Sequence, residues 1–345
     1  MKELNIGYYV IVMASVIIIL AGIKSASSIV VPFLLSMFIA IILSPFFNFL
    51  KDKKIPEGLS LLLVMGSFVL LIGLIGQLIG SSVNDFSAHI NVYAKKLSQD
   101  YLLVVNYLHD YGIDLPIDEI LDSLNAKRIM ALGSSLLQGV GSIFSDGFIV
   151  LLLVVFMLLE STHFLVKIDY ADGPRDTIIH IQEISSKIKR YMVIKALISL
   201  LTAFIIYLGL LAIGTEYAFL WAVLAFMFNF IPNIGSIIAA LPAVLITLVQ
   251  LGSMSAFLIA ILYVSVNIVI GSIIEPKVMG RGLGLSTLVV FISLLFWGWL
   301  LGIVGMLLSI PLTIMAKIAF DAHTNTKWIS VLLGTGENLE EIEYK

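Results

Sequence analysis

Long apolar stretches separated by short polar ones run through most of the chain. The clearest of them cover residues 6–23, 29–50, 59–80, 147–159, 191–213 and 256–274. About 20 apolar residues form a helix long enough to cross the hydrocarbon core of a bilayer, which is about 30 Å thick. The pattern therefore predicts an all-α polytopic membrane protein with about six full spans.

Two further apolar stretches, residues 218–251 and 287–320, contain residues that a lipid-facing helix avoids. As a continuous helix each would be about 51 Å long, well beyond the hydrocarbon core. Each carries a central glycine followed six or seven residues later by a proline. The pairs are Gly235 with Pro242 and Gly305 with Pro311. Irregular backbone survives in hydrocarbon only inside protein or beside water, so the repeat predicts two inverted, broken or re-entrant hairpins that line a cavity.

Polar segments between these stretches set the remaining organisation. Residues 81–146 form an insertion whose apolar positions recur every three or four residues, which predicts an amphipathic helix starting at Asn84 or Asp85. This insertion is either a small domain that covers its own apolar face, or a subunit contact or interfacial helix. Residues 175–190 predict a basic amphipathic helix in the cytoplasmic headgroup layer. The chain thus divides into 1–80, 81–146, 147–213, 214–320 and an acidic, partly disordered tail, 321–345.

The distribution of positive charge predicts the orientation in the membrane. Lysines at 51–54 and the basic segment 167–190 are expected to be cytoplasmic, together with the N-terminus. If the two broken segments are hairpins that enter from opposite faces, Lys277 and Arg281 are cytoplasmic as well, and so are both termini. Eight simple spans would place these two charges outside. The positive-inside rule therefore favours the hairpins.

Composition supports the membrane class and restricts the chemistry. Of the 345 residues 60% are hydrophobic and only 12% are charged, about half the share of soluble domains. Cysteine is absent, the net charge is −3, and the five histidines lie outside the predicted spans without metal-ligand spacing. No nucleotide-binding loop or hydrolase motif occurs. We therefore expect no catalytic residues, metal, cofactor or nucleic-acid partner, and membrane lipids as the surroundings.

Neutral polar residues gather around the first predicted break and in the span after it. The candidate substrate-binding residues are Asn229, Pro232, Asn233, Gly235, Ser236 and Asn267. Asn229, Asn233 and Ser236 offer hydrogen-bond donors and acceptors suited to a polyhydroxylated ligand, or they cap backbone groups exposed at the kink. Asn267 lies in an apolar span and is expected to face protein, with substrate contact as the alternative.

Residues after that span form a second group of candidates, for gating or coupling. They are Glu275, Lys277, Arg281, Ser286 and Pro311. A charge in the middle of a bilayer costs about 2.5–3.5 kcal/mol, so Glu275 and Arg281 are expected to pair, to face water or to lie at the interface. They either clamp the glycine-rich loop or act directly in transport. Lys195 lies near the end of a predicted span, where a snorkelling side chain is the default expectation.

Several segments of this chain resemble one family of transporters. Residues 228–236, 275–286 and 291–319 resemble the signature segments of the autoinducer-2 exporter family, and the resemblance covers nearly the whole chain. It implies a quorum-signal exporter of the bacterial inner membrane, assembled as a homo-oligomer, a pentamer, that moves its substrate by an elevator-like displacement. Autoinducer-2 is a small furanosyl signal, and the family also contains sodium(lithium)/proton antiporters.

Three functions are open at this point. The chain is a secondary transporter that exports a small polar signal, a cation/proton antiporter in which Glu275 exchanges the proton, or a non-transporting scaffold that docks partners on residues 81–146. Because no ATP-binding motif occurs, export would run on an ion gradient or on the gradient of the signal itself. We favour the first reading.

Overall fold

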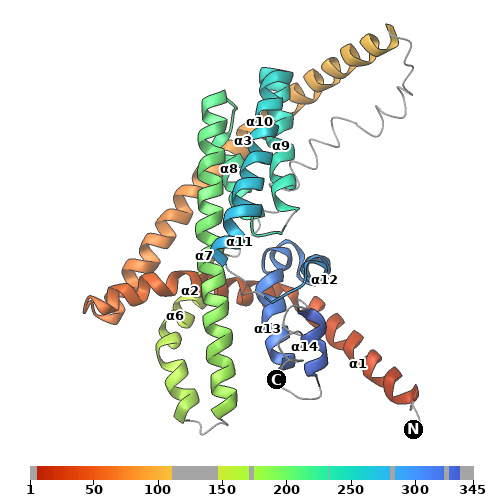
Figure 1. Ribbon diagram of the computed structural model, residues 1–345. Helices are drawn as coiled ribbons and strands as arrows, with labels where there is room; N and C mark the ends of the chain where they lie inside the picture. The colour runs from red at the N-terminus through yellow and green to blue at the C-terminus, as the bar shows by residue number, and fades with distance from the viewer. Residues whose placement is uncertain are drawn as a thin grey trace.

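The computed structural model describes residues 6–110, 147–170, 175–232, 234–279, 284–321 and 326–334. In these ranges the elements are α1 (Ile6–Ser25), α2 (Ser27–Asp52), α3 (Glu57–Asp110), α6 (Gly147–Tyr170), α7 (Arg175–Ile213), α8 (Ala218–Phe228), α9 (Gly235–Leu251), α10 (Ser253–Val266), a π-helix (Asn267–Ile274), α11 (Glu275–Met279), α12 (Thr287–Leu307), α13 (Ser309–Asp321) and α14 (Lys327–Leu333) (Figure 1). The described part is helical with short connecting turns and no strand. The predicted all-α class is confirmed for it.

Five stretches of helix are long and apolar enough to cross a membrane. They are Ser27–Asp52, Glu57–His89, Ser186–Ile213, Ser253–Met279 and Thr287–Leu307, and shorter apolar helices accompany them in α1, α6, α8 and α9. Large apolar side chains on these helices point away from the protein, for example Leu62, which is 70% exposed, and Phe148, which is 78% exposed. Such surfaces suit lipid, so the protein is membrane-embedded and multi-pass. The number of full spans and the side of each terminus stay predictions.

Helices α3 and α7 are longer than the sequence pattern predicts. No helix begins at Asn84 or Asp85, because α3 continues from Glu57 to Asp110 as one helix of 54 residues. The predicted interfacial helix over 175–190 is likewise the first part of α7, which has 39 residues. Residues 81–110 and 175–208 contain neither glycine nor proline, so nothing interrupts the hydrogen bonding of either helix. In each helix the change from apolar to polar residues is therefore not a helix boundary. It reflects different surroundings of the two parts of one helix.

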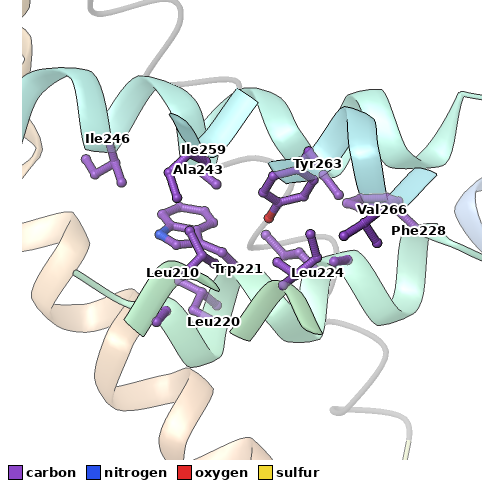
Figure 2. Packing of buried hydrophobic residues seen from close by; sticks show 14 of the residues in the cluster. Leu210, Leu220, Trp221, Leu224, Phe228, Ala243, Ile246, Ile259, Tyr263 and Val266 are labelled. Atoms are coloured by element: carbon purple, nitrogen blue, oxygen red, sulfur yellow. The ribbon is translucent and has the colours of Figure 1, made fainter. Parts of the chain in front are cut away.

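Helix α7 connects two hydrophobic cores. Its later residues, such as Ile206 and Leu210, pack with α8, α9 and α10 in the first core, which Figure 2 shows. Its earlier residues, such as Ile188 and Met192, pack with α2, α12 and α13 in the second core. The two cores therefore meet around the middle of α7.

Both broken segments fold back on themselves at a closely packed glycine. A Cβ atom on Gly235 would lie 1.7 Å from the carbonyl oxygen of Phe228, and one on Gly305 would lie 2.1 Å from that of Trp297. Each glycine therefore lets the returning helix touch the backbone of the outgoing one. In α12 the chain also breaks at Gly302, where φ is 68° and ψ is −150°.

Hydrogen bonds join the two arms of each hairpin. In the first hairpin, α8–α9, the hydroxyls of Thr215 and Thr247 are 3.1 Å apart, so the residue three positions before α8 lies against the last part of α9. In the second hairpin, α12–α13, Trp297 Nε1 donates to Thr313 Oγ1 at 3.0 Å. Lys317 Nζ donates to the carbonyl oxygen of Gly284, next to the start of α12. The folded-back shape is thus present in both segments, while their re-entry into a membrane stays a prediction.

The tips of the two hairpins pack against each other's cores. Phe230, in the turn of the first hairpin, packs against the second core. Met306 and Leu307, at the turn of the second hairpin, pack against the first core. The hairpins therefore approach each other at the junction of the two cores.

Part of the predicted acidic tail is helical. Helix α14 lies after residue 321, where the tail was expected to begin, and it packs on α13.

Candidate functional site

A small cavity, lined by apolar residues and by several amides and hydroxyls, lies at the break of the first hairpin. It is enclosed by α7, α8, α9, α10 and the π-helix, and the described residues that line it are Thr202, Ile206, Ala225, Asn229, Ser236, Ala239, Tyr263, Val266, Asn267 and Gly271. Its volume of about 10 Å³ leaves room for about one water molecule. Three of the six predicted substrate-binding residues, Asn229, Ser236 and Asn267, come together here. The cavity combines amide and hydroxyl groups with apolar walls.

The turn that carries these residues follows from the local sequence. Helix α8 ends at Phe228, four residues before Pro232, whose nitrogen carries no hydrogen to donate. Asn229 follows directly, and its Nδ2 donates to Ser199 Oγ on α7 at 2.9 Å. Its amide therefore ties the hairpin to α7. It does not cap α9, whose N-terminus has no side-chain hydrogen bond. Ser236 begins the returning helix beside the close glycine contact.

Asn267 reaches the cavity from the other side, at the start of the π-helix. The helix widens over Asn267–Ile274, directly before Pro276, which removes one backbone donor. A Cβ atom on Gly271 would lie 3.0 Å from Asn267 Oδ1, so the glycine leaves space for this amide. Wider turns of this kind are frequent at functional sites. The prediction that Asn267 faces protein agrees with its place here.

Two hydroxyls at this cavity were missed by sequence reasoning. Thr202 Oγ1 and Tyr263 OH are buried and have no hydrogen-bond partner among the described residues. Figure 2 shows the Tyr263 hydroxyl pointing from α10 toward Leu224 on α8. Their spacing to other polar residues in the apolar stretches was a signal in the sequence. Thr202 is three residues after Ser199, and Tyr263 is four residues before Asn267, so the members of each pair share a helix face.

A buried ion pair lies next to this cavity. Lys195 Nζ is 2.5 Å from Glu275 Oε1, and Lys195 is 4% exposed. The expectation of a snorkelling Lys195 is wrong, because α7 extends well beyond the predicted span and places this residue in its interior. Lys195 and Ser199 are four residues apart on α7, so they lie on the same face of this helix. The ion pair with Glu275 is therefore one helical turn away from the hydrogen bond between Ser199 and Asn229. Of the three expectations for the charge of Glu275, pairing with an opposite charge is what the structure shows.

The other described gating candidates do not line the cavity. Ser286 caps α12, because its hydroxyl accepts from Val289 N at 3.3 Å, and its own N–H donates to Leu333 O at 3.2 Å. Pro311 is buried in the first turn of α13, and Lys277 is exposed. Asn233 and Arg281 lie outside the described residues. Pro232 and Gly235 shape the turn beside the cavity without lining it.

A polar cluster holds the far end of the first hairpin. Tyr93 OH on α3 donates to Glu216 Oε2 at 2.7 Å, and Tyr217 OH donates to Asp85 Oδ2 at 2.7 Å. Gln250 Nε2, at the end of α9, donates to the same Glu216 carboxylate at 2.5 Å. Burial raises the pKa of both tyrosines, so both hydroxyls keep their protons and donate at neutral pH. This cluster links α3 to both ends of the hairpin.

A larger and more open cleft lies at the second hairpin. Its volume is about 560 Å³, and its lining includes Lys24, Ser27, Pro32, Trp299 and Gly302. The Lys24 ammonium lies 4.2 Å from the centre of the Trp299 ring. The cleft is large enough for a small molecule, since ligand pockets measure about 300–1,000 Å³. It carries a positive charge, unlike the neutral cavity at the first hairpin.

Comparison with known proteins gives consistent matches over nearly the whole chain. The model of the AI-2E family transporters matches residues 13–325. The AI-2 transport protein TqsA of Escherichia coli strain K12 is 39% identical over 325 residues, which are 94% of each chain. A Haemophilus influenzae strain Rd protein, to which a transport role is assigned provisionally, is 40% identical over 98% of this chain and 99% of its own. A similarly described protein of Bacillus subtilis strain 168, YrrI, is 25% identical over 84% of this chain and 85% of its own.

Proposed function

Because the chain belongs to the AI-2E family of transporters, we propose that it exports autoinducer-2, a small polar signal, across the bacterial inner membrane. The name of the Escherichia coli relative, an AI-2 transport protein, supports this substrate. None of the relatives named above is described as an antiporter or a scaffold. The proposal includes a homo-oligomer with cytoplasmic termini.

The neutral polar cavity at the break of the first hairpin is the observation that carries this proposal. Buried polar groups are costly unless they are hydrogen-bonded, so amides and hydroxyls inside an apolar bundle need a polar partner. Asn229, Ser236 and Asn267 present such groups from three different elements. A small, uncharged, hydroxyl-rich molecule matches them. Asn233, which follows Pro232 in the sequence, is proposed to take part as well.

Transport requires the cavity to enlarge, since room for about one water cannot hold a furanosyl signal. The described conformation is therefore proposed to be a closed state. Opening separates the first hairpin from α7, and this breaks the hydrogen bond from Asn229 to Ser199. The Lys195–Glu275 ion pair ties α7 to the segment that leads into the 275–286 loop, which gives this loop a gating role. The elevator-like displacement implied by the family would move the hairpins as a unit across the membrane.

Uptake of autoinducer-2 into inverted membrane vesicles tests the proposal. Vesicles that contain the protein should accumulate the signal faster than vesicles with an empty vector, because export from the cell becomes uptake in this orientation. Uptake with and without an imposed proton gradient shows whether transport is coupled to protons. Equal uptake with protein and with empty vector under every gradient would contradict the proposed function.

A further inference from the structure

We propose that the hydroxyls of Thr202 and Tyr263 determine the specificity of the cavity by hydrogen-bonding a hydroxyl of a neutral ligand. The inference rests on the proposed function, since it concerns the same cavity, and it adds two residues and a ligand class. Both residues belong to helices outside the hairpin, α7 and α10. The ligand would thus be held between the hairpin and the helices that face it.

The evidence begins with two unpaired groups. Thr202 Oγ1 and Tyr263 OH are buried without a hydrogen-bond partner in the described part of the chain, and Tyr263 is only 4% exposed. The large majority of buried polar atoms in proteins have a partner, and leaving one without a partner is destabilising. Valine and phenylalanine have nearly the same shapes and would avoid this loss. Hydroxyls in these places therefore indicate a polar partner that the described residues do not supply, and a ligand in the cavity would supply it.

Position distinguishes these two hydroxyls from other unpaired ones. Both line the cavity together with the amides of Asn229 and Asn267, and Tyr263 lies on the same helix face as Asn267. Tyr191 OH is also buried and without a partner among the described residues, but it lies in the second core and does not line the cavity. The cavity thus combines hydroxyls and amides contributed by α7, the hairpin and the α10/π-helix segment, and both kinds of group can donate and accept hydrogen bonds.

The lining also restricts the charge of the ligand. No aspartate, glutamate, lysine, arginine or histidine occurs among the described lining residues. Lys195 and Glu275, close by, form an ion pair with each other. A charged ligand would be buried there without a counter-charge, which is strongly unfavourable. A ligand that carries hydroxyls and no net charge is therefore preferred, and an analogue without the contacted hydroxyl should be discriminated against.

Vesicle transport assays with matched variants test the inference. For autoinducer-2, Tyr263→Phe and Thr202→Val should each raise KM about threefold to tenfold, the effect of one neutral hydrogen bond, with little change in maximal rate. Thr202→Ser, which keeps a hydroxyl, should retain a KM close to that of the unchanged protein. Tyr191→Phe, which removes a buried hydroxyl away from the cavity, should leave KM unchanged. An unchanged KM in both Tyr263→Phe and Thr202→Val would overturn the inference.

Thermal unfolding separates a binding role from a structural one. Without ligand, Tyr263→Phe and Tyr191→Phe should melt at or above the temperature of the unchanged protein, because each loses an unpaired buried group. A stabilising shift by autoinducer-2 should be smaller in Tyr263→Phe and preserved in Tyr191→Phe. A lower melting temperature of Tyr263→Phe without ligand would indicate a structural hydroxyl and overturn the inference.

A second set of probes separates this inference from the proposed function. Absence of autoinducer-2 transport in the unchanged protein would refute the proposed function only. Thermal shifts with ribose and with ribose 5-phosphate then test the cavity directly. The inference predicts a shift with ribose that Tyr263→Phe loses and no comparable shift through this cavity with the phosphate. No shift with either autoinducer-2 or ribose would overturn it.

Discussion

Lys195 of α7 and Glu275 of α11 form an ion pair, with 2.5 Å between Nζ and Oε1, at the level where the two hydrophobic cores meet. On α7 the lysine lies between Met192 of the second core and Ile198 of the first. Glu275 likewise follows Ile274, which packs on the first core, and precedes Met279, which packs on the second. The pair therefore ties α7 to α11 at the junction of the two hydrophobic cores.

Breaking this pair should destabilise the protein more than removing it altogether. Glu275→Gln leaves the buried Lys195 ammonium unpaired, and Lys195→Met leaves the carboxylate of Glu275, whose side chain is 18% exposed, unpaired. The cost is about 3–5 kcal/mol for fully buried pairs, and we expect a smaller loss for Lys195→Met. The double variant Lys195→Met/Glu275→Leu leaves no charge and should be more stable than either single variant. Thermal unfolding in detergent measures all three. Losses that simply add in the double variant would show that the two residues do not interact.

Glycines at the hairpin turns should not tolerate even one methyl group. Gly235→Ala and Gly305→Ala would place Cβ atoms 1.7 Å and 2.1 Å from backbone carbonyl oxygens, so the hairpins must shift apart. We expect lower melting temperatures and loss of transport. Gly73→Ala is the matched control, because nothing lies within 4 Å of its Cβ position and alanine favours a helix by up to about 1 kcal/mol over glycine. Equal melting temperatures for Gly235→Ala and Gly73→Ala would contradict the close packing at this turn.

High pH should loosen the polar cluster at the far end of the first hairpin. Burial raises the pKa of Tyr93 and Tyr217, so the folded state holds both protons more tightly than the unfolded state, whose tyrosines titrate near pH 10. The stabilisation is thus present below about pH 10 and is lost as the pH rises through the folded pKa values. The protection of the backbone amides of residues 85–93 against hydrogen exchange, measured relative to the intrinsic base-catalysed rate, should fall in that range. The double variant Tyr93→Phe/Tyr217→Phe should lose this pH dependence, and retention of it would assign the effect to other groups.

A disulfide should form between the two ends of the first hairpin. The hydroxyls of Thr215 and Thr247 are 3.1 Å apart, and the chain contains no native cysteine. Thr215→Cys/Thr247→Cys should therefore cross-link under mild oxidation, whereas Thr215→Cys/Ile237→Cys, which pairs one end with the tip, should not. Mass spectrometry of digested protein identifies the link. A continuous helix over residues 218–251 would be about 51 Å long and would keep these ends apart.

Sequence patterns identified the helices and the breaks because both depend on local chemistry. Gly235 marks the turn because it lets two backbones approach closely, and Pro232 marks it because it has no N–H to donate to a helix. Asn229 and Ser236 stand out because they are polar residues within an otherwise apolar stretch. The roles of Lys195 and Tyr263 depend on which helices meet, and composition within a single helix does not contain that information. Lys195 was misjudged because the predicted boundary of its span lay too close to it. The π-helix at Asn267 likewise becomes visible only through its hydrogen bonds.

The central claim is that the cavity at the break of the first hairpin lies on the path of the transported signal. Modification of a single cysteine tests it most directly, because the native chain has none. Ser236→Cys should transport autoinducer-2 until a small, membrane-permeant methanethiosulfonate modifies the thiol and fills a cavity that has room for about one water. Autoinducer-2 should slow this modification. Gly58→Cys, at an exposed position on the first turn of α3, should be modified without loss of transport. Undiminished transport after complete modification at residue 236 would contradict the account.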